Sequence, residues 1–113
     1  MKLVIFMRTD LNMSRGKIAV QAGHAVAITM KMSNQEDIDA WFDNAQTKIV
    51  LSINSYQELC EVKNEAVKRG LPCYVIHDAG KTEVDPNTVT CLAVGIAPTG
   101  RLDKFTKGFK TLN

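Results

Sequence analysis

Apolar and polar residues follow one another along the chain in blocks that predict strands and helices in turn. Residues 2–7 form a short apolar run rich in branched side chains, which is typical of a buried strand. Residues 47–54 and 73–77 show the same pattern, and residues 88–96 form a longer apolar run. We therefore expect four strands, separated by polar turns and helical segments.

The first predicted helix follows the first strand and a loop rich in turn-forming residues. Ser14 is a candidate N-cap, and the helix opens at Gly16 and Lys17 and runs to about Met30. Four alanines lie within it, and such small side chains allow a helix to approach a sheet closely.

Two further helices are predicted from their capping signals. Residues 33–36 and 55–58 each read as a capping box, with Ser at the N-cap and Glu three positions later. Gly70 followed by Pro72 is a typical stop for the helix that begins after the second box. The expected apolar faces of these two helices are Ile38, Trp41 and Phe42, and Leu59, Val62 and Ala66.

The order of these elements predicts an α/β fold. Helices separate the first three strands, which can pair in parallel through helical crossovers. Only the polar loop of residues 78–87 separates the last two strands, so these are either antiparallel neighbours or lie apart in the sheet. The basic tail, residues 101–113, is ambiguous. We expect a single layered domain, residues 1–113, with a mixed four-stranded sheet packed by helices.

Composition narrows the class of protein. The 113 residues are 45% hydrophobic and 23% charged, a globular balance that argues against global disorder. The chain has no apolar run near the roughly 20 residues that span a bilayer, and its N-terminal run is too short for a signal peptide. We therefore expect a cytoplasmic protein. Cys60, Cys73 and Cys91 show no disulfide or zinc spacing, so we expect them in the core.

Charge is unevenly distributed although the net charge is only +2. Residues 1–31 carry five Lys or Arg and one Asp, and residues 67–113 carry seven Lys or Arg and four acids. Residues 32–66 carry seven acids and two Lys. If the two basic ends fold together, they form a positive face that attracts a polyanion; ordinary solvated charge is the alternative.

A polar stripe on the first predicted helix is the first candidate for chemistry. Lys17, Gln21 and His24 stand at positions i, i+4 and i+7 and project from one side, with Ala22 and Ala25 on the other sides. The stripe is either a solvent face or a site near the helix N-terminus. In a site, Lys17 would add its charge to the free N–H groups and favour a phosphate or a developing oxyanion.

Asp78 is the second candidate, because ligand sites in α/β sheets lie beyond the carboxyl ends of strands. It is either a turn residue or a base that orients a water. His77 would point to the opposite face of the strand, so the two would not act as a pair. Residues 80–82 read Gly-Lys-Thr, but Val75 stands where a phosphate loop needs glycine, which excludes that motif.

Thr88 and Thr90 would share one face of the last strand. They reflect either strand propensity or hydroxyls that orient a water or a substrate. The chain lacks a nucleophile motif of the Ser or Cys hydrolases. The residues alone therefore indicate a globular α/β domain with a polar site, and no more.

Three segments resemble the family 2 peptidyl-tRNA hydrolases, in order, within residues 2–98. Residues 8–25 resemble its opening signature, R-x-D-L-x-M-x-x-G-K-x-A-x-Q-x-x-H-A. Residues 78–82 resemble its D-A-G-x-T signature, and residues 86–95 resemble P-G-x-x-T-x-L-A-x-G, with Asn87 in place of the glycine. Asn tolerates positive φ, so the turn can survive this change. The tail, residues 106–112, resembles the family's ending only loosely.

This resemblance implies a small α/β homodimer that hydrolyses the ester between a peptide and the 3′ ribose of tRNA, without a metal or cofactor. Asp78 would orient or deprotonate a water with help from Thr90, and Lys17 would stabilise the charge on the ester oxygen. The alternatives are a non-catalytic paralogue that binds tRNA or another anionic partner, and a hydrolase of a different acyl ester. The positions that match the catalytic residues are Lys17, Asp78, Thr82 and Thr90, and the expected substrate-binding residues are Gln21, His24, Arg8, Arg15 and Lys81.

Overall fold

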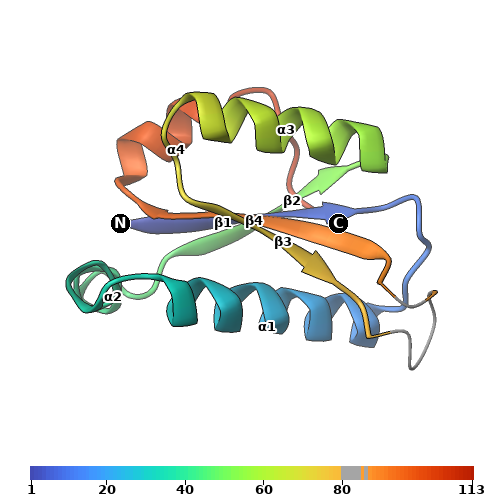
Figure 1. Ribbon diagram of the computed structural model, residues 1–113, viewed down its shortest axis with the longest axis horizontal. Helices are drawn as coiled ribbons and strands as arrows, with labels where there is room; N and C mark the ends of the chain where they lie inside the picture. The colour runs from blue at the N-terminus through green and yellow to red at the C-terminus, as the bar shows by residue number, and fades with distance from the viewer. Residues whose placement is uncertain (80–84, 86) are drawn as a thin grey trace.

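A four-stranded mixed sheet in the order β2-β1-β4-β3 forms the middle layer of the protein (Figure 1). The computed structural model describes residues 1–79, 85 and 87–113. The strands are β1 (Lys2–Arg8), β2 (Lys48–Ile53), β3 (Cys73–His77) and β4 (Val89–Ala97). The helices are α1 (Arg15–Met32), α2 (Gln35–Asp43), α3 (Tyr56–Lys68) and α4 (Thr99–Phe105). The predicted α/β class and mixed sheet are confirmed.

The pairing of one strand, β3, differs from the prediction. β1 and β2 are parallel, as expected, but β3 pairs only with β4, which is antiparallel to both of its neighbours. The expectation that the first three strands could pair with one another is therefore wrong for β3. The reason lies in β4, whose residues from Thr90 to Ala97 are all buried. A strand that is apolar on both faces suits the centre of a sheet covered on both sides.

Helices cover both faces of this sheet: α1 and α2 lie on one face, and α3 and α4 on the other (Figure 1). β1 shows how one strand serves two cores, because successive side chains point to opposite faces. Leu3, Ile5 and Met7 pack in the cluster beneath α1 and α2. Val4 and Phe6 pack in the cluster beneath α3 and α4.

Three of the predicted helix caps are confirmed, and one is wrong. Ser14 and Ser55 cap α1 and α3, accepting hydrogen bonds from the backbone N–H groups of Lys17 and Glu58. Gly70, at φ +68°, ends α3 in a Schellman motif. The box at residues 33–36 is shifted by one position, because α1 runs on to Met32 and uses Ser33 as its own C-cap. Asn34 therefore caps α2.

Two further expectations are corrected by burial. Cys91 is buried, but Cys60 and Cys73 are only half-buried, so the three cysteines are not all core residues. Phe42 is 45% exposed, whereas Trp41 on the same helix is fully buried.

Among the described residues, no helix has the length and apolarity needed to cross a membrane.

The ambiguous tail has a definite structure. It forms α4 and then runs along the outer edge of β2, where Leu51 and Thr111 form an antiparallel bridge. The backbone N–H of Ser52 donates to the Lys110 carbonyl at 2.8 Å, and the N–H of Leu112 donates to the Val50 carbonyl at 2.9 Å.

Candidate active site

The candidate site lies where the carboxyl ends of three strands meet the first turn of α1. β1, β2 and β3 run in the same direction, so their ends lie at one edge of the sheet, and β4 begins there because it runs in the opposite direction. α1 starts at the same edge after the loop that follows β1 (Figure 1). This arrangement brings Lys17 and Asp78 together although 60 residues separate them in the chain.

Lys17 and Asp78 form an ion pair that is almost completely shielded from water. The Lys17 ammonium contacts Oδ1 of Asp78, and the two side chains are 9% and 2% exposed. The side-chain amide of Gln21 donates a hydrogen bond of 3.1 Å to the same oxygen. A buried carboxylate is stable only when charge and hydrogen bonds replace its hydration, and these two donors do so.

Gln21 links this ion pair to Thr90. Its Nε2 faces Asp78, and its Oε1 accepts a hydrogen bond of 2.5 Å from the Thr90 hydroxyl. Gln21 and Thr90 are both fully buried. The four side chains thus form a continuous polar chain in the order Lys17, Asp78, Gln21, Thr90, whose members fix one another's orientation.

The backbone holds Asp78 just beyond the end of β3. Its N–H donates to the Thr88 carbonyl at 2.8 Å, and its carbonyl accepts from the Asn87 N–H at 2.9 Å. Asn87 has φ +64°, the left-handed conformation expected from an asparagine in place of the family's glycine. The prediction that the turn survives this substitution is confirmed.

Two basic residues and the N-terminus of α1 lie beside the chain of four residues, and each basic side chain is paired with a carboxylate. Lys17 lies in the first turn of α1, where backbone N–H groups carry a partial positive charge. Arg8 lies at the same edge, donates to the Val89 carbonyl at 2.9 Å and contacts Asp10 through two hydrogen bonds. These bonds hold the pKa of the Asp10 carboxyl below its usual value. Such surroundings favour an anionic ligand or a developing oxyanion.

Cys91 lies directly behind the site but does not take part as a nucleophile. Its thiol contacts the backbone carbonyl of Gln21 at 3.7 Å. Burial raises the pKa of the Cys91 thiol from 9.0 to about 12, although a hydrogen bond with Thr90 acts in the opposite direction. The thiol therefore stays protonated at neutral pH, and the thiolate is the reactive form.

The two histidines lie outside this chain of hydrogen bonds. His24 and His77 are exposed and line a hollow of about 200 Å³ together with Ile28, Val75 and Ile76. His77 Nδ1 lies 3.2 Å from the Asn87 carbonyl oxygen. Asp78 is buried and His77 is exposed, so they do not act as a pair, as expected.

The structure does not bring the remaining predicted site residues into this hydrogen-bonded chain. Arg15 is exposed at the start of α1. Lys81 and Thr82 lie outside the described residues. Thr88 bonds to the Asp85 carbonyl rather than to the site, so Thr88 and Thr90 have different partners. Among the described residues, no group of three or more His, Cys, Asp or Glu side chains could hold a metal ion.

The sequence missed the central position of Gln21. The solvent-face interpretation of the polar stripe is wrong for Lys17 and Gln21 and correct only for His24. Ala25, expected on another side, lies on the same buried stripe of α1, which consists of Gln21, Ala25 and Thr29. Their spacing of four residues was the available signal, because a small residue on each following turn lets Gln21 sit against the sheet.

Comparison with known proteins identifies the family of the chain. The family model described as "Peptidyl-tRNA hydrolase PTH2" matches residues 1–112. Proteins named peptidyl-tRNA hydrolase are similar over nearly the whole chain. That of Methanocaldococcus jannaschii is 39% identical over 115 residues, covering 99% of this chain and 100% of the relative. That of Metallosphaera sedula is 42% identical, with 99% and 100% coverage, and that of Thermococcus onnurineus is 45% identical, with 96% and 95% coverage. The chain therefore belongs to the peptidyl-tRNA hydrolase PTH2 family.

Proposed function

We propose that this protein hydrolyses the ester between a peptide, or an N-blocked amino acid, and the 3′ ribose of tRNA, and that Lys17 and Asp78 carry the reaction. The observation that supports this proposal most strongly is the buried Asp78 carboxylate, which is held by an ammonium and an amide in a member of this family. We also propose that it acts in the cytoplasm, because its substrate is a product of translation.

Asp78 acts on the attacking water. Its carboxylate orients the water and accepts a proton as the water oxygen attacks the ester carbonyl carbon. When the carbon–oxygen bond to the ribose breaks, the same proton passes to the departing 3′ oxygen, so the products are a free carboxylic acid and a tRNA with a 3′ hydroxyl. General acid–base catalysis of this kind contributes roughly 10²–10⁴ in rate.

Lys17 stabilises the negative charge that develops on the carbonyl oxygen. Its ammonium lies in the first turn of α1, so charge and helix dipole act in the same direction. Removal of one such donor typically costs about 10²–10³ in rate.

Gln21 and Thr90 act through Asp78 rather than on the substrate. Both are fully buried, and the Thr90 hydroxyl donates to Gln21, whose amide donates to Asp78. We therefore assign Thr90 a positioning role, which is narrower than the catalytic role that the family resemblance implies. Thr82 is assigned to the same geometry on the resemblance alone.

tRNA is held mainly through its phosphates. Arg8, Arg15 and Lys81 are the proposed contacts, and the hollow beside His24, which His77 also lines next to Asp78, is the proposed place for the acyl end of the substrate. Because phosphate contacts release counterions, tRNA binding should weaken steeply as salt rises. A salt titration of tRNA binding to wild type and Arg15→Gln should show a smaller slope for the variant.

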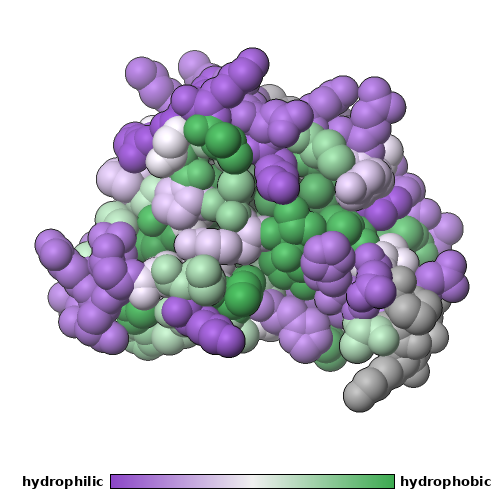
Figure 2. Space-filling view, in the orientation of Figure 1, coloured by the Kyte–Doolittle hydropathy of each residue, from purple (hydrophilic) through white to green (hydrophobic). Residues whose placement is uncertain are grey.

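We further propose that the protein is a homodimer. Figure 2 shows apolar side chains gathered in a band across the middle of one face, at the level of the sheet, with polar side chains above and below. Cys73, Tyr74 and Val75 on the edge strand β3 are only half-buried in the monomer. An apolar band of this kind is a typical interaction surface. Sedimentation equilibrium should give twice the chain mass; a single chain mass at micromolar concentration would contradict the dimer.

The decisive experiment is turnover of N-acetyl-aminoacyl-tRNA by the purified protein. Asp78→Asn and Lys17→Ala should each lower the rate by about a hundredfold or more. Asp43→Asn is the matched control, because it removes an exposed carboxylate at the end of α2 and should leave the rate unchanged.

Two outcomes would overturn this function. Salt-sensitive tRNA binding without wild-type turnover would indicate a binding paralogue. Faster turnover of free N-blocked aminoacyl esters than of the tRNA substrate would indicate a hydrolase of another ester.

A further inference from the structure

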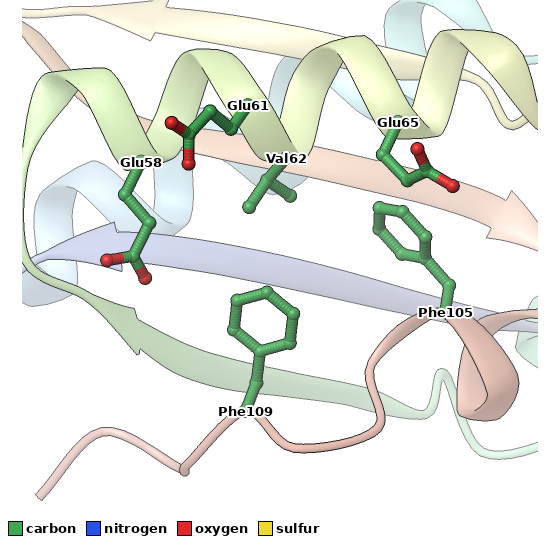
Figure 3. Close-up of a pocket in the computed structure, with 6 residues that line it drawn as sticks. All are labelled: Glu58, Glu61, Val62, Glu65, Phe105 and Phe109. Carbon is green, nitrogen blue, oxygen red and sulfur yellow. The ribbon is translucent and has the colours of Figure 1, made fainter.

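A groove of about 420 Å³ lies between α3 and the C-terminal tail, on the opposite face of the sheet from Lys17 and Asp78 (Figure 3). We call it the α3 groove. Its apolar floor consists of Val62, Phe105 and Phe109, and its acidic rim consists of Glu58, Glu61 and Glu65. It is larger than the hollow of about 200 Å³ beside His24.

The floor of the α3 groove is held in place by the core. The rings of Phe105 and Phe109 contact Phe6 edge to face, with centroids 6.0 and 5.1 Å apart. Phe6 is fully buried on β1, so it fixes both rings from below. A ligand would therefore meet a preformed surface and would not have to order it.

The rim places three carboxylates on one side of α3. Glu58, Glu61 and Glu65 stand at positions i, i+3 and i+7, so they follow the same face of the helix. Among the described ion pairs, Glu65 has a partner, while Glu58 and Glu61 have none. The groove thus combines an apolar floor with net negative charge, which attracts a cation with an apolar body and repels phosphate.

The chain itself shows which cation fits. At one end of the groove, Arg69 donates to Glu65 at 3.0 Å, and its guanidinium lies 5.4 Å from the centre of the Phe105 ring. An arginine thus stacks on a phenylalanine and pairs with a glutamate on the same helix. A planar guanidinium suits this double contact better than an ammonium does.

The other end of the groove also has a phenylalanine ring and a glutamate among its lining residues. The Phe105 ring lies beneath Glu65, and the Phe109 ring lies below Val62 with the Glu58 carboxylate to one side of it (Figure 3). We propose that the α3 groove binds an arginine-bearing segment of a partner protein. Its guanidinium stacks on Phe109 and pairs with Glu58 and Glu61, and an adjacent apolar side chain packs on Val62.

This binding is independent of the proposed hydrolase activity, because the sheet separates the groove from the candidate active site. The acidic rim disfavours a polyanion such as tRNA as the occupant. The protein can therefore engage a basic protein segment on one face while its substrate occupies the other.

The test is a titration of the ¹⁵N-labelled full chain with short peptides, followed by NMR. A blocked peptide of sequence GRLRG should shift backbone amide signals in α3 and in residues 105–110. The peptide GKLKG should bind about threefold more weakly, because it retains charge but loses planar stacking. The peptide GELEG should cause no shifts.

Variants assign the binding to the rim and to the floor. Glu61→Gln, which removes an exposed carboxylate, should weaken GRLRG binding by roughly threefold. Glu36→Gln is the matched control on α2 and should bind as wild type does. Phe109→Leu keeps an apolar floor but removes the ring, and should abolish the preference for arginine over lysine. All three variants should hydrolyse N-acetyl-aminoacyl-tRNA at the wild-type rate.

Any of four outcomes would overturn the proposal. GRLRG shifts could lie on another surface or persist unchanged in Glu61→Gln. The α3 signals could instead shift with protein concentration in the absence of peptide, which would make a second copy of the chain the occupant. Saturating tRNA could displace the peptide, which would place nucleic acid in the groove. Failure of the turnover assay alone would leave this inference standing.

Discussion

Two ion pairs on opposite faces of one sheet show how burial changes the use of the same chemistry. Lys17 and Asp78 are 9% and 2% exposed, whereas Arg69 and Glu65 are each 46% exposed. Both pairs join a basic side chain to a carboxylate. Only the first is built from distant parts of the chain, because α1 and the end of β3 must pack together before it can form.

The difference determines what each pair can do. Dehydration of the buried pair costs free energy, which its mutual attraction and the Gln21 hydrogen bond offset. A carboxylate held in this way has a fixed orientation, and water screens its charge only weakly, so it is suited to act on a substrate. The exposed pair is screened by water and salt and contributes little to folding, so its residues remain available to contact other molecules.

The largest expected effect is on stability when each pair loses its cation. Lys17→Met leaves a buried carboxylate without its ammonium and should lower the free energy of unfolding by about 3–5 kcal/mol. Arg69→Met, the matched change in the exposed pair, should cost less than about 1 kcal/mol. Urea denaturation at pH 7 measures both. Equal losses of unfolding free energy in the two variants would show that burial does not distinguish the two ion pairs.

Cysteine reactivity tests the same contrast, because Cys91 is buried behind the candidate active site and Cys60 is half-buried on α3. Burial raises the pKa of Cys91 from 9.0 to about 12, so its thiolate fraction at pH 8 should be about a thousandfold below that of an ordinary thiol. Iodoacetamide labelling followed by mass spectrometry should modify Cys60 first and Cys91 only after unfolding. Equal rates in the folded protein would refute this expectation.

The raised Cys91 pKa also gives stability a pH dependence. The unfolded thiol ionises above about pH 9, while the folded thiol stays protonated until about pH 12. The contribution of Cys91 to stability is therefore complete below pH 9 and is lost as the pH rises towards 12.

A moderate effect is expected from Thr90, which tests whether the buried hydrogen bonds position Asp78. Thr90→Val removes the donor to Gln21 and should lower kcat about tenfold, with KM nearly unchanged and a stability loss of about 1–3 kcal/mol. Thr90→Ser keeps the hydroxyl and should restore most of kcat. If Thr90→Val changed only stability, the residue would be structural.

The smallest effect is expected at Asp10, whose carboxylate is bound by Arg8 near the surface. The Arg8 hydrogen bonds lower its pKa below 3.8, so its stabilising contribution is present above that pH and is lost as the pH falls further. Asp10→Asn should therefore destabilise the protein by less than about 1 kcal/mol at pH 7. The difference from wild type should shrink at pH 3, and urea denaturation at both pH values measures it.

The sequence predicted what depends on neighbours along the chain. The strands are apolar runs, and the caps at Ser14, Ser55 and Gly70 follow from a few adjacent residues. It failed where two local signals compete, as at residues 33 and 34, where the end of α1 decides which residue caps α2. The insertion of β4 between β1 and β3 could not be derived, because sheet order depends on which faces are covered after folding.

The structure brings together four side chains that the sequence selected, Lys17, Asp78, Gln21 and Thr90, but the sequence did not predict how they are arranged. Helical spacing selected Lys17, Gln21 and His24, and the end of a strand selected Asp78. The family motifs matched Lys17, Asp78, Thr82 and Thr90. Spacing alone could not separate the buried Gln21 from the exposed His24, since both stand on the Lys17 side of the helix. That distinction arises only when β4 places the Thr90 hydroxyl opposite Gln21.

The tail that lies along β2 also affects how the folded protein behaves in a crowded solution. An unpaired strand edge is a template onto which the strands of other molecules can add, and such addition leads to aggregates. Here the backbone groups of Val50 and Ser52 already bind Leu112 and Lys110, so that edge is closed from within the chain. Residues 110–112 thus shield this part of the β2 edge from pairing with another chain, and loosening them would expose it.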